Sequence, residues 1–172
     1  MTLPPPPILF CHGLESSPQG AKVVALRDAG HSVDAPDFQA MPLQARVEKL
    51  LHVLSRYPSP PLVIGSSYGG LAALCAYTLR TERGEPSGNL LLCAPALGLK
   101  EPPADRLEFV TPTPTVVLHG VRDEVVPIAH SREFAAASPH RQLVEVDDDH
   151  RLSRSMPVLL ELVRKLGVGA GR

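Results

Sequence analysis

The sequence predicts an α/β fold: a doubly wound, parallel sheet of about six strands with helices on both faces, arranged as three αβα layers. Three observations support this prediction. Segments with the composition of strands alternate with segments of helical composition. The strand segments are apolar almost throughout, so they need cover on both faces, as the strands of a parallel sheet do. The length of 172 residues fits one compact domain, residues 1–172.

The first half of the chain contains three predicted strand and helix pairs. Residues 1–7, MTLPPPP, are expected to form a stiff, extended lead-in to the first strand. That strand, ILFCH, precedes a predicted helix at residues 20–29, and HSVDAPD precedes one at residues 43–56. The third strand, LVIGS, leads into a helix at residues 70–80, which is a good helix-forming segment.

The second half continues the alternation with one interruption. The strand NLLLCAP is followed by a proline-rich connection without periodicity, residues 95–114, which is expected to cross the edge of the sheet. TVVLHG then precedes a predicted helix at residues 128–137, and QLVEVDD precedes a last helix at residues 155–166. These elements complete the predicted sheet.

The charge balance and the cysteines argue against some classes of function, such as nucleic-acid binding and binding to anionic membranes. Lysine and arginine number 17 against 18 aspartates and glutamates, so no broad positive field is available to attract nucleic acid or an anionic membrane. Cys11, Cys75 and Cys93 lie in apolar runs without CxxC spacing, which indicates reduced, buried thiols and a cytoplasmic protein. No export signal is recognisable, and no window reaches the ~18 apolar residues of a membrane-spanning helix.

The turns after the strands are the expected place of function, because doubly wound sheets bind ligands beyond the carboxyl ends of their strands. One such turn, GSSYGG, contains a G-x-S-x-G motif between a strand and a helix. Ser67 is the central serine and the predicted nucleophile, on a strained turn where side chains at Gly65 and Gly69 would collide with neighbouring backbone. Small residues also occur in phosphate-binding and structural turns, so the motif alone does not establish catalysis.

Two further turns supply the partners that a nucleophilic serine needs. Asp123 follows the strand TVVLHG, and His150 follows the last strand. Each of the three residues is expected after a separate strand, at the same end of the sheet, in the order Ser67, Asp123, His150. This arrangement predicts acyl transfer, with His150 as general acid and base and Asp123 as the carboxylate that orients the imidazole.

An oxyanion hole is expected from two backbone N–H groups. One is that of Tyr68, at the start of the helix after the serine, where the helix dipole also favours negative charge. The other is that of Leu14, in the turn after the first strand, where Gly13 lets the chain bend. Ser16 and Ser17 come next and are expected to cap the following helix.

The remaining polar residues near strand ends are expected to have structural roles. His12 and His119 each precede a glycine at a strand end, where a hydrogen bond to backbone is the expected role. The acidic run from Asp147 to Asp149 is expected to be a solvated strand end, because the glycine and terminal glutamate of a calcium loop are absent. No metal site is therefore expected.

The motifs HGLESSP, GHSVDAPD, GSSYGG, HGVRDEVVP and DHRL together resemble the α/β-hydrolase superfamily, and within it the small, lid-poor, YqiA-like bacterial esterases. The resemblance covers nearly the whole chain. Larger members have two further N-terminal strands, whereas only MTLPPPP precedes ILFCHG here, so the sheet resembles a minimal α/β-hydrolase fold. The resemblance implies a serine hydrolase that acts on carboxylic esters or thioesters without a cofactor.

The function expected from the sequence is that of a serine esterase or thioesterase whose partner is a small-molecule substrate. The connection from Ala96 to Thr113 is too short to build a deep acyl tunnel, so short acyl chains are expected. Two alternatives stay open. One is a noncatalytic protein that uses the same pocket to bind a ligand or a partner, and the other is amide hydrolysis or perhydrolysis at the same three residues.

Overall fold

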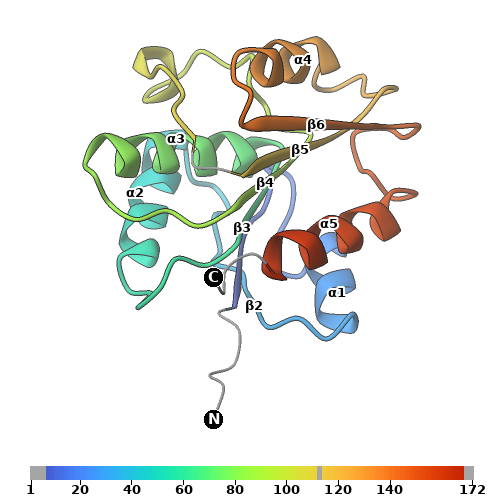
Figure 1. Cartoon of the computed structure of the whole chain (residues 1–172), viewed down its shortest axis with the longest axis horizontal. Helices are drawn as coiled ribbons and strands as arrows, with labels where there is room; N and C mark the ends of the chain where they lie inside the picture. The colour runs from blue at the N-terminus through green and yellow to red at the C-terminus, as the bar shows by residue number, and fades with distance from the viewer. Residues whose placement is uncertain (1–6, 112–113, 169–172) are drawn as a thin grey trace.

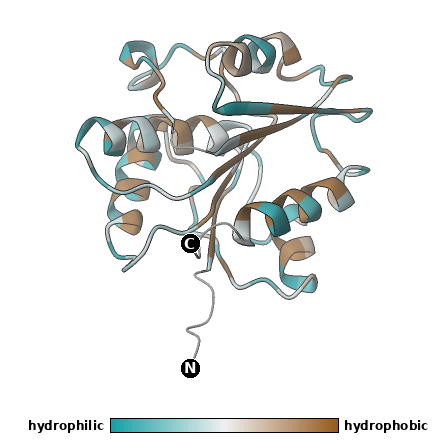
Figure 2. Cartoon of the chain, in the orientation of Figure 1, coloured by the Kyte–Doolittle hydropathy of each residue, from teal (hydrophilic) through white to brown (hydrophobic). Residues whose placement is uncertain are grey.

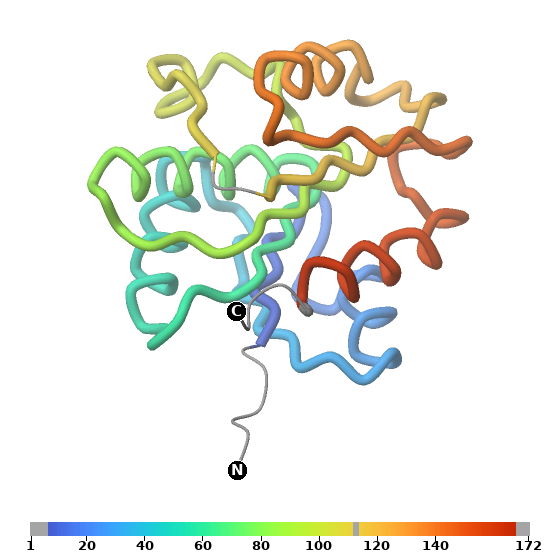
Figure 3. Tube along the Cα trace, viewed as in Figure 1, coloured from blue at the N-terminus to red at the C-terminus, as the bar shows by residue number. Residues whose placement is uncertain are grey.

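Six parallel strands form one sheet in the computed structural model, which describes residues 7–111 and 114–168 (Figures 1 and 3). Their order across the sheet is β2-β1-β3-β4-β5-β6, and every neighbouring pair is parallel. All but the last residue of the predicted lead-in, residues 1–7, lie outside the described residues. The strands are β1 (Ile8–Cys11), β2 (Val33–Asp34), β3 (Val63–Ser66), β4 (Leu90–Cys93), β5 (Thr115–Gly120) and β6 (Arg141–Val146).

Helices cover both faces of the sheet, as the sequence predicts. Helices α2 and α3 lie on one face and α1 and α5 on the other (Figure 1). The apolar side chains of alternate strand residues face opposite layers, because Leu9 packs in the cluster that includes α2 and α3, and Phe10 packs with α1 and α5. The strands in the middle of the molecule are hydrophobic over most of their length (Figure 2). The helices are α1 (Ala21–Asp28), α2 (Leu43–Leu54), α3 (Tyr68–Glu82), α4 (Ile128–Ala136) and α5 (Met156–Val168), with a short 3₁₀ helix at Ala104–Arg106.

Strand β2 and helix α3 differ from the prediction in ways that have a clear physical reason. Strand β2 has two residues instead of seven, because it lies at an edge of the sheet and pairs with β1 only at Val33 and Asp34. Pro36 follows closely and has no N–H to donate to a ladder. Helix α3 begins at Tyr68 and not at Gly70, so the chain turns from strand to helix within a single residue, Ser67.

The parallel arrangement places the carboxyl ends of all the strands at one edge of the sheet. The turns after β1, β3, β5 and β6 therefore come together there, although they lie far apart in the sequence (Figure 1). In the part of the chain that the structure describes, no helix is long and apolar enough to cross a membrane.

Candidate active site

Ser67 occupies a backbone conformation that few side chains adopt, with φ 53° and ψ −118°. The glycines around it are required by close approach of backbone segments. A Cβ at Gly65 would lie 2.6 Å from the Cα of Gly70, and one at Gly69 would lie 2.1 Å from the carbonyl oxygen of Cys11. The G-x-S-x-G motif thus packs β3, α3 and β1 together and leaves Ser67 at the end of the sheet.

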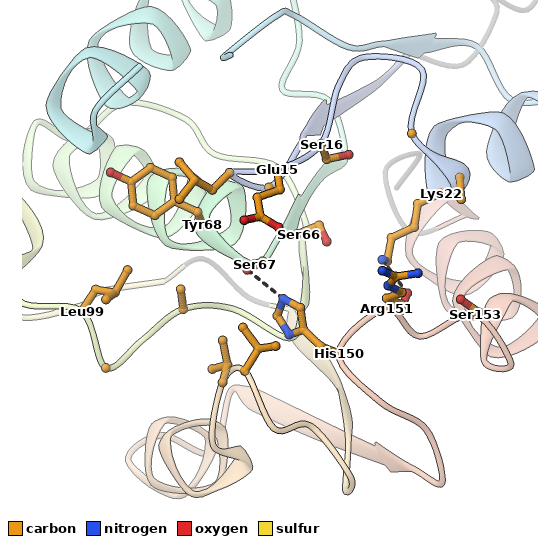
Figure 4. Close-up of a pocket in the computed structure, with 18 of the residues that line it drawn as sticks. Glu15, Ser16, Lys22, Ser66, Ser67, Tyr68, Leu99, His150, Arg151 and Ser153 are labelled. Carbon is orange, nitrogen blue, oxygen red and sulfur yellow. Dashed lines mark hydrogen bonds between the residues drawn. The ribbon is translucent and has the colours of Figure 1, made fainter. Parts of the chain in front are cut away.

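Ser67, His150 and Asp123 are hydrogen-bonded in series (Figure 4 shows the first of the two bonds). The Oγ of Ser67 lies 3.0 Å from Nε2 of His150, and Nδ1 of His150 lies 2.7 Å from Oδ2 of Asp123. Since the carboxylate can only accept, Nδ1 carries the proton and Nε2 is free to accept the serine hydroxyl hydrogen. The Asp123 side chain is fully buried, whereas that of His150 is 22% exposed.

The Asp123 carboxylate is held by further hydrogen bonds that fix its orientation. Its Oδ1 accepts the backbone N–H groups of Val125 at 2.9 Å and Val126 at 2.8 Å. Its Oδ2, which faces His150, also lies 3.1 Å from Nε2 of His119. Both oxygens are therefore occupied by donors from the turn after β5 and from the end of that strand.

His119 is a second imidazole beside Asp123, and sequence reasoning missed this contact. Its predicted bond to backbone is present, because Nε2 lies 3.0 Å from the carbonyl oxygen of Val126. Its Nδ1 lies 2.7 Å from Oγ of Ser131. Burial lowers the pKa of His119, so the ring is neutral, with Nε2–H donating to Asp123 and Val126 and Nδ1 accepting from Ser131. The signal in the sequence that could have indicated this contact is the four-residue spacing from His119 to Asp123.

The loop that carries His150 is anchored by Asp148. The prediction of a solvated strand end is wrong for this residue, which is only 3% exposed. Its Oδ2 accepts the N–H groups of Arg154 and Ser155 and the Ser155 hydroxyl, all at 2.9 Å, and Oδ1 accepts the Asp149 N–H at 2.8 Å. Burial alone would raise the pKa of Asp148, but these hydrogen bonds outweigh it and hold the pKa below the ordinary 3.8.

The two residues predicted to form an oxyanion hole, Leu14 and Tyr68, lie near Ser67. Tyr68 is the first residue of α3, so its N–H has no acceptor within the helix. Leu14 lies in the turn after β1. This turn passes close to Ser67, because a Cβ placed on Gly13 would lie 3.5 Å from the Cβ of Ser67. Leu14 and Tyr68 line the same cleft as Ser67 and His150.

The predicted capping role of the two serines after Leu14 is wrong. Gly20 is the N-cap residue of α1, and no side chain caps that helix. The Ser17 hydroxyl instead accepts the N–H of Gln19 at 3.2 Å, and Ser16 lines the cleft. Gly20 takes the cap position because its backbone lies against Ser16, where a Cβ would be 2.6 Å from the Ser16 Oγ.

A cleft of about 1010 Å³ opens in front of Ser67. Three large apolar side chains on its walls are strongly exposed: Leu14 at 59%, Leu99 at 44% and Val125 at 69%. The segment that carries Leu99 is held over the start of α3 by Glu101, whose Oε1 accepts the hydroxyl of Tyr68 and the N–H of Leu43. Exposed apolar surface of this kind is typical of a binding site.

Thiol and metal chemistry have no candidate groups among residues 7–111 and 114–168. No cluster of three or more histidine, cysteine, aspartate or glutamate side chains there could hold a metal ion. The three thiols are buried, as predicted. Burial raises the pKa of Cys11, and it raises that of Cys75 to about 12 and that of Cys93 to about 11, so all three stay protonated near neutral pH.

Known structures share this fold. One is a hydrolase of the α/β superfamily from Xanthomonas campestris, 26% identical, with a TM-score of 0.72 over 92% of this chain and 98% of that one. Mouse alpha/beta hydrolase domain-containing protein 10 is 21% identical, with a TM-score of 0.77 over 95% and 91%. Est1E from Butyrivibrio proteoclasticus is 19% identical, with a TM-score of 0.73 over 95% and 87%.

These similarities define the class of protein. The chain is a member of the α/β-hydrolase superfamily, and its described residues form the six-stranded parallel sheet that the sequence predicts. No protein-family model matches the sequence, and a search of curated proteins finds no match. The finer resemblance to YqiA-like esterases stays a prediction.

Proposed function

We propose that this protein is a serine hydrolase that cleaves a carboxylic ester or thioester, with Ser67 as nucleophile. The observation that carries the proposal is the hydrogen-bonded series from Ser67 through His150 to Asp123, at the floor of an open cleft. A serine hydroxyl becomes nucleophilic when a base lies within hydrogen-bond reach and a carboxylate orients that base. The two distances, 3.0 Å and 2.7 Å, meet this requirement.

The proposed reaction has two halves. Ser67 Oγ attacks the carbonyl carbon while Nε2 of His150 takes its proton, and the N–H groups of Tyr68 and Leu14 stabilise the oxyanion. The tetrahedral intermediate collapses to an acyl-enzyme when the leaving oxygen or sulfur takes the proton from Nε2. Water then attacks the acyl group with His150 as base, which releases the acid and restores Ser67.

Asp123 supports both halves by holding one tautomer. Its Oδ2 accepts the Nδ1 proton of His150, which leaves Nε2 to exchange protons with Ser67 and the leaving group. The negative charge also stabilises the imidazolium that forms in each half. Since Oδ1 is held by two backbone N–H groups, the carboxylate needs no rearrangement during the reaction.

The nucleophile is tested by covalent labelling. A fluorophosphonate should label Ser67, as located by peptide mass mapping, and Ser67→Ala should abolish labelling and lower kcat for ester hydrolysis by on the order of 10⁶. Ser66→Ala is the matched control, because Ser66 lines the same cleft one residue earlier and has no part in the series. Full activity in Ser67→Ala would contradict the serine mechanism. A folded wild-type protein that takes no label and cleaves no ester would indicate a binding protein instead.

A further inference from the structure

The cleft has two chemically different ends, with Ser67 and His150 between them. Leu99 lies on one side of Ser67, and Lys22, Arg151 and Ser153 lie on the opposite side (Figure 4). The side of Leu99 carries that exposed apolar side chain and the ring of Tyr68, whose hydroxyl is bonded to Glu101. The opposite side carries two positive charges and hydroxyl groups.

A hydrogen bond between distant parts of the chain holds the Lys22 ammonium against the backbone of Arg151. The Nζ of half-buried Lys22, in α1, donates to the backbone carbonyl oxygen of Arg151 at 2.9 Å. Arg151 directly follows His150, so this bond ties α1 to the loop that carries the proposed base. An anion bound at this wall would be attracted by both side chains.

No protein carboxylate supplies that anion among the residues that the structure describes. The ion pairs found there involve neither the Lys22 ammonium nor the Arg151 guanidinium. Glu15, an acidic residue of the cleft wall, lies on the Ser67 side, away from both cations in Figure 4. Asp149 accepts the backbone N–H of Arg151 at 2.9 Å but forms no ion pair with either cation. The negative charge of Glu15 disfavours an anion close to the reacting carbonyl. It does not prevent an anion from binding near Lys22 and Arg151, at the other end of the cleft.

We propose that Lys22 and Arg151 bind an anionic group, a carboxylate or a phosphate, on the leaving group of the substrate. The leaving atom must take its proton from Nε2 of His150, so the leaving group departs on the side of His150 and the adjacent Arg151. The acyl group then lies towards Leu99. The inference rests on the proposed ester or thioester hydrolysis and adds the substrate class: a small apolar acyl group on an anionic alcohol or thiol.

The test compares two esters that differ in one charge: the butyryl ester of 4-hydroxy-3-nitrobenzoic acid and that of its methyl ester. The quantity compared is kcat/KM for the charged ester divided by kcat/KM for the neutral ester. We expect Lys22→Gln and Arg151→Gln each to lower this ratio about two- to fivefold, which is the size of effect that partly exposed ion pairs have. The double variant should lower the ratio about tenfold, and 0.5 M salt should reduce the wild-type ratio. Intrinsic reactivity cancels, because each variant is compared with wild type on the same two esters.

A matched control is Lys165→Gln, which removes a surface ammonium paired with Glu161 at 2.7 Å on α5. It should leave the ratio unchanged. An unchanged ratio in the double variant would overturn the proposal, as would an equal loss for both esters.

Calorimetry with the product anion, 4-hydroxy-3-nitrobenzoate, separates this proposal from the proposed function. Ser67→Ala protein should bind the anion more tightly than its methyl ester, and the added Lys22→Gln and Arg151→Gln changes should remove the difference. Binding without any turnover in wild type would refute the hydrolase and keep the anion site. Equal binding of the two compounds would refute the anion site, whatever the turnover.

Discussion

Asp123 and Asp148 are buried carboxylates that each accept several hydrogen bonds, yet they support the site differently. Asp123 faces an imidazole that must change its charge during the proposed reaction. Asp148 faces only its own loop and the start of α5, through Asp149, Arg154 and Ser155. The first residue therefore acts on the proton of His150, and the second on the position of the loop.

Asparagine at these two positions should separate the two roles. Asp123→Asn should lower kcat by up to about 10⁴ with little change in Tm, because the amide stabilises the wrong imidazole tautomer. Asp148→Asn should lower Tm, because each buried donor left unpaired lowers the free energy of unfolding by about 1–3 kcal/mol. In a chain of this size each kcal/mol corresponds to roughly 2–4 °C in Tm. Steady-state kinetics and thermal melts of both proteins measure this, with Asp147→Asn as the exposed control, whose ion pair with Arg122 lies at the surface.

The lowered pKa of Asp148 also fixes the sign of its pH dependence. A carboxyl whose folded pKa is below its unfolded value stabilises the protein above the ordinary pKa of 3.8 and loses that contribution as pH falls through the folded value. The Tm difference between wild type and Asp148→Asn should therefore be full at pH 6 and shrink below about pH 4. A difference that stays constant down to pH 3 would contradict the assigned contacts.

The segment between β4 and β5 determines how much acyl chain the cleft can cover. Its side chains Leu97, Leu107 and Phe109 pack against the core, so they are not available to line a tunnel. Leu99 lines the cleft and is 44% exposed. Because Glu101 binds the hydroxyl of Tyr68, the segment lies against the start of α3 and forms a shallow apolar wall.

This wall predicts a short acyl optimum. Each buried methylene contributes about 0.8 kcal/mol, or roughly fourfold in binding, until the apolar surface ends. The kcat/KM for nitrophenyl esters should thus rise over short chains and flatten or fall for long ones. Leu99→Ala should reduce the preference for butyrate over acetate, while Val110→Ala, exposed and outside the cleft, should not. A palmitoyl optimum below the micellar concentration would show an acyl groove that this segment does not form.

At the scale of the whole molecule, the features that could be predicted from the sequence are the positions of the buried strands and of the turns that follow them. Parallel strands are apolar throughout, so their positions and the turns after them could be read from composition, and those turns hold Ser67, Asp123 and His150. Their catalytic roles stay predictions.

Contacts between side chains from distant segments could not be predicted in this way. The bond from Lys22 to Arg151 joins residues 129 positions apart, and it depends on how α1 packs beside the loop after β6. The buried state of Asp148 likewise depends on the start of α5, because its partners only come within reach once the loop has folded back. The short length of β2 follows from its place at the sheet edge, which composition does not reveal.

The backbone of Ser67 has a consequence for the stability of the whole protein. A side chain held at φ 53° and ψ −118° stores strain of order 1–3 kcal/mol, whereas glycine adopts this conformation freely. After allowing about 0.5–1 kcal/mol for the greater freedom of unfolded glycine, Ser67→Gly should be more stable than wild type by about 1 kcal/mol, or roughly 2–4 °C in Tm. Ser67→Ala keeps its Cβ and should show no such gain in a thermal melt. An unchanged or lower Tm in Ser67→Gly would mean that the turn is not strained.

The most heat-resistant residue at position 67 would then be one that cannot attack an ester. A library screened only for survival after heating would enrich glycine there and lose the proposed enzyme, although every other part of the fold stayed intact. Selection for thermal tolerance and selection for turnover would act in opposite directions at this one residue, so an engineered variant of this protein would have to gain its heat resistance elsewhere in the chain.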